Sequence, residues 1–186
     1  MKRFFRTSSL VVLLALAAAV PASAQAPDGV PIQGSTVSAD GMLPPQDAPG
    51  FPDCPAGTMW RYVSEGSGRL SHLGQVDVFV THCSVFDEAT GSGSFGSGTM
   101  TFTAANGDTL VLAQSGTFQL VGDPSSGEFL SEIEGEWTVV GGSGRFLDSS
   151  GSGHLVALGD LLAGDNGVTA ARFDGMIHYD ASMRSK

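Results

Sequence analysis

The stretch EFLSEIEGEWTVV, residues 128–140, decides the fold class of this chain. Its side chains alternate between an apolar face and an acidic face. The apolar face consists of Phe129, Ile133, Trp137 and Val139, and the acidic face of Glu128, Glu132, Glu134 and Glu136. A period of two is typical of a β-strand that buries one face and exposes the other to water. The stretch therefore predicts a half-buried strand. The same alternation argues against the glutamates as paired carboxylates for glycoside cleavage.

Similar strand patterns lie on both sides of this stretch and are separated by glycine-containing turns. Asn106-Gly107 is a strong hairpin signal, and only Leu155–Leu162 fits a helix as well as it fits a strand. Glycine accounts for 26 of the 186 residues, which disfavours helices. The pattern predicts an all-β domain, either a sandwich or a closed barrel. The further predicted strands are Thr58–Ser64, Arg69–Cys83, Thr99–Ala104, Thr109–Leu120, Gly153–Leu158 and Arg172–Tyr179.

The N-terminus has the pattern of a secretory signal peptide. Three basic residues precede the unbroken apolar run Leu10–Val20, and Ala22-Ser23-Ala24 supplies an A-x-A cleavage pattern. The alternative is a retained membrane anchor, but a span needs about 20 apolar residues and this run is shorter. We therefore expect residues 1–24 to be removed, leaving a secreted or periplasmic protein without a membrane span.

The remaining chain divides into three parts. Residues 25–57 contain seven of the nine prolines and no apolar periodicity, which predicts an extended or disordered leader. Residues 58–180 form a β-domain of ordinary single-core size. Residues 181–186 are a short tail.

Charge excludes two classes of partner. Three of the nine Lys and Arg residues precede residue 25, so the exported chain has six against 19 Asp and Glu, a net charge of −13. A chain this acidic is a poor ligand for nucleic acid and for anionic lipid surfaces.

The two cysteines, Cys54 and Cys83, both lie in the exported part. An even count in an oxidising compartment predicts one disulfide. Free thiols are the main alternative. Metal binding by these cysteines would need further ligands at close spacing, which the sequence lacks.

Few residues suggest chemistry. Gly91, Gly93 and Gly96 satisfy G-x-G-x-x-G, but a strand pattern follows them where a dinucleotide site needs a helix. We expect no cofactor and no metal, although four separated histidines could in principle converge inside a barrel. Asp77 lies in the strand pattern QVDVFV, and either of its faces could point inward. An inward Asp77 would be a buried general acid or base, with His72 the next candidate, whereas an outward Asp77 would only be solvated.

The segment Val139-Val140-Gly141-Gly142-Ser143-Gly144-Arg145-Phe146 resembles the V-V-G-G-T-G-x-F turn of dirigent proteins and the related allene-oxide-cyclase-like barrels. Gly151, Phe173-x-Gly175 and the pattern from Gly66 to Gly74 are also similar to secreted bacterial members. The resemblance implies a single antiparallel eight-stranded calycin-like β-barrel, often trimeric. Ser143 replaces the usual threonine, and Ser149-Ser150 stand where the family has Ala-Arg. No pocket residue carries over, because the turn is structural: Gly141, Gly142 and Gly144 permit positive φ, and Phe146 anchors the corner.

Two functions follow as expectations. The first is a non-enzymatic barrel that binds an apolar small molecule in its lumen. The second, which the resemblance implies, is a cyclase or isomerase that controls ring closure or coupling of a reactive small molecule. Small residues in the strands leave room beside large aromatic side chains, which predicts a lined cavity, although tapered packing would leave none. The aromatic candidates for that lining are Trp60, Phe102, Phe118 and Trp137.

Overall fold

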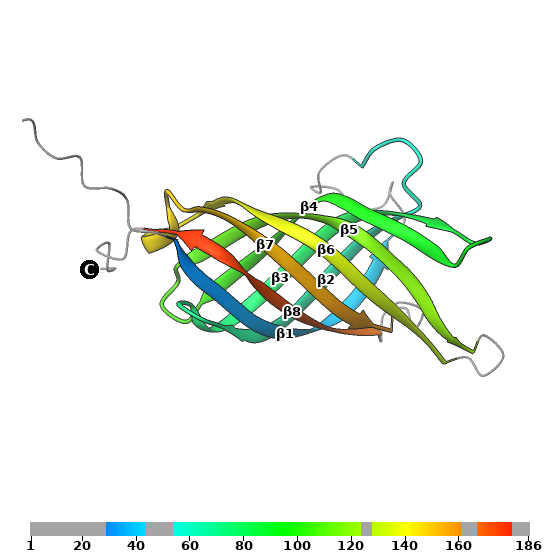
Figure 1. The fold of residues 1–186 in the computed structure, drawn as a ribbon, viewed down its shortest axis with the longest axis horizontal. Helices are drawn as coiled ribbons and strands as arrows, with labels where there is room; N and C mark the ends of the chain where they lie inside the picture. Colours follow the sequence, from blue (N-terminus) through cyan, green and yellow to red (C-terminus); the bar gives the residue numbers. More distant parts are fainter. Residues whose placement is uncertain (1–28, 44–53, 124–127, 161–166, 180–186) are drawn as a thin grey trace, which may run out of the picture.

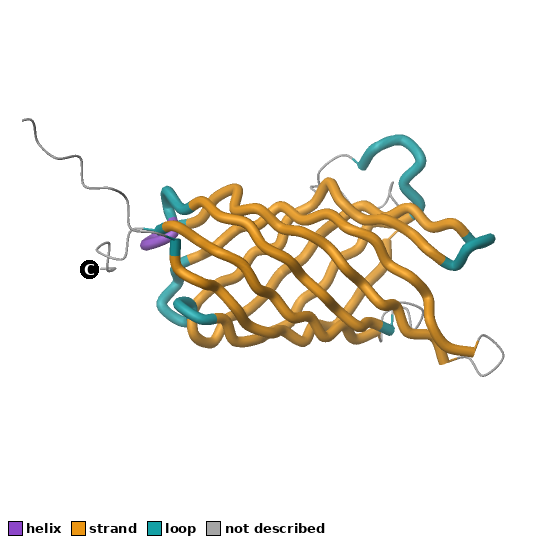
Figure 2. Tube along the Cα trace, in the orientation of Figure 1, coloured by secondary structure: helices purple, strands orange, loops and turns teal. Residues whose placement is uncertain are grey.

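The computed structural model describes residues 29–43, 54–123, 128–160 and 167–179. These residues form eight β-strands and one turn of 3-10 helix (Figure 2). In chain order the elements are β1 (Val30–Leu43), β2 (Trp60–Leu70), β3 (Gly74–Asp87), β4 (Ser92–Ala104), β5 (Thr109–Asp123), β6 (Glu128–Gly142), η2 (Gly144–Phe146), β7 (Ser150–Gly159) and β8 (Gly167–His178).

The strands close into one antiparallel barrel. Each strand pairs with the next in sequence, and β8 returns to pair with β1 from Val30 opposite Ile177 to Asp40 opposite Gly167. Every strand therefore has a neighbour on both sides, and the barrel has no free sheet edge. The prediction of an all-β, eight-stranded antiparallel barrel is confirmed (Figure 1).

The two ends of the barrel differ. The β2–β3 turn, the β4–β5 turn and η2 lie at one end, which we call the η2 end. The β3–β4 turn lies at the opposite end, the hairpin end, where the β3–β4 and β5–β6 hairpins extend furthest (Figure 1).

Apolar side chains fill the interior toward the η2 end. Phe102 packs edge-on against Phe173, with ring centroids 5.4 Å apart, and both rings are buried. Burial of each such side chain stabilises the fold by about 1.5–3 kcal/mol. Other buried members of this packed core are Ile32, Leu70, Val76, Leu110, Leu112, Trp137, Phe146 and Ile177.

The prediction that residues 25–57 lie outside the β-domain is wrong for residues 30–43, which form β1 and complete the barrel. The inner face of β1 ends in Thr36, Ser38 and Asp40, so an apolar alternation is absent although these side chains are buried. Pro31 is tolerated because it stands at the start of the strand, before pairing with β2 begins at Gly34. Residues 1–28, 44–53 and 180–186, which include the predicted signal peptide and tail, lie outside the described residues.

The predicted strand Arg69–Cys83 is also wrong, because a tight turn at residues 71–73 divides it between β2 and β3. His72 and Gly74 take positive φ values of 68° and 78° there. A histidine at positive φ is uncommon, and it gives no sequence signal for a turn.

The disulfide between Cys54 and Cys83 is confirmed, with 5.6 Å between the two Cα atoms. Cys83 lies in β3, and Cys54 precedes β2, so the bond fastens the segment before β2 to the barrel wall. The alternating strand at 128–140 is confirmed as well: Trp137 is buried, whereas Glu132, Glu134 and Glu136 are exposed.

Candidate functional site

A cavity of about 100 Å³ lies inside the barrel between the packed core and the hairpin end, and all eight strands contribute side chains to it. One enclosed water needs only about 10–15 Å³ of such space, so the cavity can hold a small organic molecule. Its apolar lining consists of Trp60, Val80, Phe86, Phe95, Met100, Phe118, Leu120, Ile133, Leu155, Ala157, Ala171 and Phe173, and its polar lining of Thr36, Ser38, Tyr62, Ser64, His82, Ser84, Gln114 and Thr169.

The polar groups are clustered on one part of the wall, whereas apolar side chains occur all round it. With the exception of Gln114 on β5, the polar side chains come from the four neighbouring strands β8, β1, β2 and β3. The lining residues from β4, β6 and β7 are all apolar. Toward the hairpin end, Phe86 of β3 packs against Trp60 of β2 and Phe118 of β5, at centroid distances of 5.9 and 6.0 Å. A cavity with one polar and one apolar side orients a ligand as well as enclosing it.

A chain of hydrogen bonds lies behind the polar side. The Thr169 hydroxyl donates to Oδ2 of Asp40 at 2.5 Å, and the Tyr62 hydroxyl lies 3.2 Å from Thr169 Oγ1. A threonine has one hydroxyl hydrogen, and Asp40 already receives it, so Tyr62 is the donor in the second bond. Burial, reinforced by the nearby Asp40 carboxylate, raises the pKa of Tyr62 above its ordinary value. The phenol is therefore neutral.

His82 is held beside Tyr62. Its imidazole stacks on the phenol with centroids 4.4 Å apart, and Phe95 lies against it at 5.0 Å. The amide nitrogen of Gln114 lies 3.4 Å from Nδ1. Burial lowers the pKa of His82 to about 3, because the wall around it offers poor solvation for a cation.

The neighbouring strand β4 has a bulge beside His82. The β3–β4 register shifts between Thr81 and Cys83, and Ser97 of β4 takes a positive φ of 52°. A Cβ on Gly98 would lie within 2.5 Å of the His82 Cα, so only glycine allows β4 to approach there. Such bulges redirect side chains along a strand.

Two of the four aromatic residues predicted to line the cavity do so. Trp60 and Phe118 are among the lining residues, whereas Phe102 and Trp137 are buried in the packed core. Trp137 fills space that glycines leave open, because a Cβ on Gly153 or Gly175 would meet its ring. The sequence left two alternatives open, tapered packing and a lined cavity. Both are present: the barrel is packed toward the η2 end and has a cavity toward the hairpin end.

The structure does not place either predicted catalytic candidate in the cavity. Asp77 lies on the outer face of β3 and is exposed, because Val76, Val78 and Val80 occupy the inner face. His72 lies in the β2–β3 turn at the η2 end, where Nε2 is 3.0 Å from the Pro31 carbonyl oxygen. The condition for a catalytic Asp77, an inward side chain, is not met.

The glycine-rich corner is structural, as the sequence suggested, but its glycines act in different ways. Gly144 has a positive φ of 57°, and a Cβ there would collide with Asp108. A Cβ on Gly142 would lie 2.6 Å from the Thr109 carbonyl oxygen without any unusual φ, and Gly141 has open space around it. The prediction of positive φ is therefore confirmed only at Gly144. Phe146 is fully buried.

Sequence reasoning missed the polar groups that matter in the cavity. Asp40 and Thr36 lie in a segment assigned to the leader. His82 shares the parity of Val76, Val78 and Val80, so the correct choice of inner face for β3 would have identified it.

Neither a protein-family model nor a curated protein nor a solved structure matches this chain. Within the described residues, no group of three or more His, Cys, Asp or Glu side chains could hold a metal ion. No helix in the same part of the chain is long and apolar enough to cross a membrane.

Proposed function

We propose that this chain is an exported barrel protein that binds a small, largely apolar molecule in its lumen. The observation that carries the proposal is the cavity itself, which is lined mainly by aromatic and aliphatic side chains, with a cluster of polar groups on β8, β1, β2 and β3. Ligand sites in proteins commonly have this composition. The Cys54–Cys83 disulfide is consistent with an extracellular or periplasmic location, and the signal-peptide pattern supports export.

A titration with a hydrophobic fluorescent probe tests the proposal. Trp60 lines the cavity, so a bound probe should quench its fluorescence saturably with one-to-one stoichiometry. Ala157→Phe would fill the lumen and should abolish binding, whereas Val156→Phe, on the outer face of the same strand, should leave it intact. A folded protein that binds no probe would contradict the proposal.

A second candidate function is a cyclase or isomerase of the allene-oxide-cyclase or dirigent type, the families that the Gly141–Phe146 corner resembles. The buried carboxylate of Asp40 favours it, because Thr169 connects that carboxylate to the Tyr62 phenol at the cavity wall. Asp40→Asn separates the candidates. Retained ligand binding with lost turnover of a cyclisable ligand would support the enzyme, and absence of turnover by the wild type would support the plain binder.

Self-association, which the resemblance also implies, has support on the outer surface. Val37, Val156, Leu158 and Val168 are 45–56% exposed and lie on the adjacent strands β7, β8 and β1. An apolar patch on a strongly acidic exterior is a candidate interface between copies. Light scattering of the wild type and of Leu158→Lys tests this, with a trimer expected for the wild type and a monomer for the variant.

A further inference from the structure

The lining of the cavity is uncharged, and the Asp40 carboxylate lies behind it, bonded to Thr169. None of the described residues that line it is Asp, Glu, Lys or Arg, and its titratable side chains, Tyr62 and His82, are both uncharged near neutral pH. A carboxylate ligand would enter this space without a cation to pair with, at a large desolvation cost. A cationic ligand would likewise meet no carboxylate on the lining.

Tyr62 offers an acceptor to a ligand. Its single hydroxyl hydrogen is donated to Thr169, because the Thr169 hydrogen is committed to Asp40. The Ser64 hydroxyl competes with a ligand for the lone pairs of the phenol oxygen, and the two successive bonds toward a carboxylate increase their basicity.

His82 offers a donor. An amide nitrogen can only donate, so the bond from Gln114 Nε2 makes Nδ1 the acceptor. The neutral ring then carries its hydrogen on Nε2. Tyr62 and Phe95 cover the two faces of the imidazole, so it meets a ligand through its edge.

We propose that the lumen selects an uncharged molecule with a flat apolar body and an edge that pairs a hydrogen-bond acceptor with a donor, as in a carboxamide or a hydroxyl beside a carbonyl. The ligand's acceptor would meet His82 Nε2–H, and its donor would meet the Tyr62 oxygen. This inference rests on the proposed function, whose ligand it specifies.

Calorimetric titration of the signal-free protein with four single-ring probes of similar size tests the inference. Benzamide carries the acceptor and the donor, acetophenone the acceptor only, ethylbenzene neither, and benzoate a charge. Near pH 7 we expect benzoate to bind at least about tenfold more weakly than benzamide. The two variants His82→Phe and Tyr62→Phe keep an aromatic ring, and Asp77→Asn on the outer face of β3 is the matched control.

The decisive quantity is the affinity for each polar probe divided by that for ethylbenzene, measured in each variant. His82→Phe should lower this ratio about tenfold for both benzamide and acetophenone, and Tyr62→Phe should lower it for benzamide alone. Asp77→Asn should change neither. Unchanged ratios in both folded variants, or benzoate as the tightest probe, would overturn the inference while leaving a lumen-binding protein. Failure of all four probes to bind the folded wild type would overturn the proposed function and the inference with it. If His82→Phe does not fold, the Tyr62→Phe ratios still decide the outcome.

Discussion

The imidazole of His82 lies flat against the phenol ring of Tyr62, with their planes 4° from parallel. Stacking of this kind fills the inner wall of β2 and β3 with two polar aromatic rings whose charged forms are both disfavoured. The pair therefore provides directional hydrogen-bonding groups without introducing charge.

The low pKa of His82 predicts acid sensitivity. In the unfolded chain the imidazole takes up a proton near its ordinary pKa of 6.5, whereas in the folded protein it does so only near pH 3. Between these values the unfolded state binds more protons, so the free energy of unfolding falls as pH falls, by at most about 1.4 kcal/mol per pH unit. Urea denaturation from pH 7.5 to 4 should show a larger loss of stability in the wild type than in His82→Phe.

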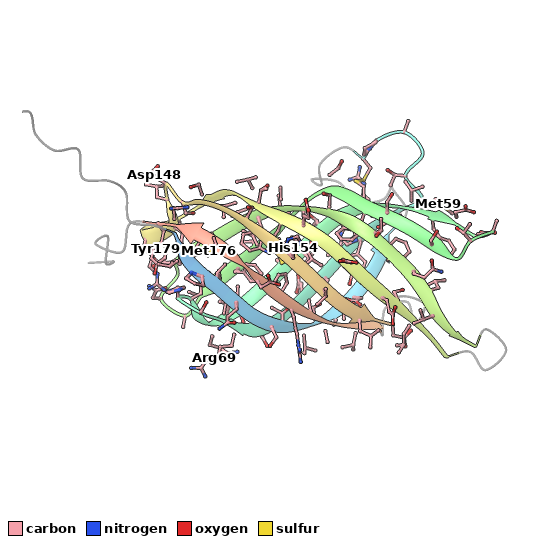
Figure 3. All side chains as sticks on the ribbon, in the orientation of Figure 1. Met59, Arg69, Asp148, His154, Met176 and Tyr179 are labelled. Atoms are coloured by element: carbon pink, nitrogen blue, oxygen red, sulfur yellow. A yellow bond between two sulfur atoms is a disulfide. The ribbon has the colours of Figure 1, made fainter. Side chains whose placement is uncertain are left out.

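His154 provides the control for that experiment, because it is exposed on the outer face of β7 (Figure 3). His154→Gln should follow the wild-type pH profile. Parallel profiles for the wild type and His82→Phe would contradict the low pKa, because they would show that His82 binds its proton equally well in the folded and unfolded states.

The glycine corner predicts an order of stability among three variants. Gly144→Val introduces both strain at positive φ and a collision with Asp108, and Gly142→Val places atoms against backbone carbonyl oxygens. Each should lower the free energy of unfolding by more than about 1 kcal/mol. Gly141→Ala should be neutral within about 0.5 kcal/mol, because nothing lies within 4 Å of its Cβ position. Equal melting temperatures for all three would contradict this account of the corner.

Phe146 closes the η2 end, so its truncation should be costly. The side chain is fully buried and packs against Tyr179 with a centroid distance of 5.0 Å. We expect Phe146→Ala to lower the free energy of unfolding by about 3–5 kcal/mol. Leu147→Ala, one residue away and 56% exposed, should change it little. Similar urea midpoints for the two variants would place Phe146 outside the core.

The disulfide should matter for stability as well as for covalent structure. It links residues separated by 29 positions, and in the chain-entropy model such a loop contributes about 3–4 kcal/mol. The double variant Cys54→Ala, Cys83→Ala should lose that amount in urea denaturation. Two reactive thiols in the native wild-type protein would contradict the bond.

Export makes a prediction about mass. Intact mass of the secreted or periplasmic protein should correspond to a chain that starts near Gln25 and lacks two hydrogens. Recovery of the full 186-residue chain from that fraction would show that the A-x-A site is not cleaved.

Alternation along most strands predicted an all-β domain, either a sandwich or a barrel, and the choice of an eight-stranded barrel came from the resemblance of the glycine-rich corner. In β6, inward Trp137 and outward Glu136 differ enough in polarity to reveal the face, and the Asn106-Gly107 turn is a local chemical signal. β1 was not recognised as a strand because its inward side chains face a partly polar cavity and do not alternate clearly in polarity with the outward ones. A strand is recognised in a sequence by apolar residues at every second position. The inward residues of β1 are partly polar because they lie at the polar side of the cavity, so β1 lacks that pattern.

The site itself depends on contacts between residues far apart in the sequence, and such contacts leave no recognisable motif in any one segment. Asp40 and Thr169 lie at opposite ends of the chain and meet only because β8 pairs with β1. The β4 bulge beside His82, at Ser97 and Gly98, interrupts the pairing with both β3 and β5. Four separate histidines gave no reason to choose His82 over His72 until the inner face of β3 was known.

The pairing of β1 with β8 is the seam at which the barrel closes, and it joins the first strand to the last. Contacts so distant in sequence carry a high entropic cost, so the seam is expected to be completed late in folding. Until then, β2 and β8 present unpaired backbone groups, to which β1 of another copy can pair in place of the chain's own at high protein concentration. A chain cut between residues 44 and 53 would hold β1 by strand pairing alone, so β1 could be exchanged between copies and the exposed edges of β2 and β8 could join one copy to the next, whereas after a cut between residues 55 and 59 the Cys54–Cys83 bond would still keep β1 attached.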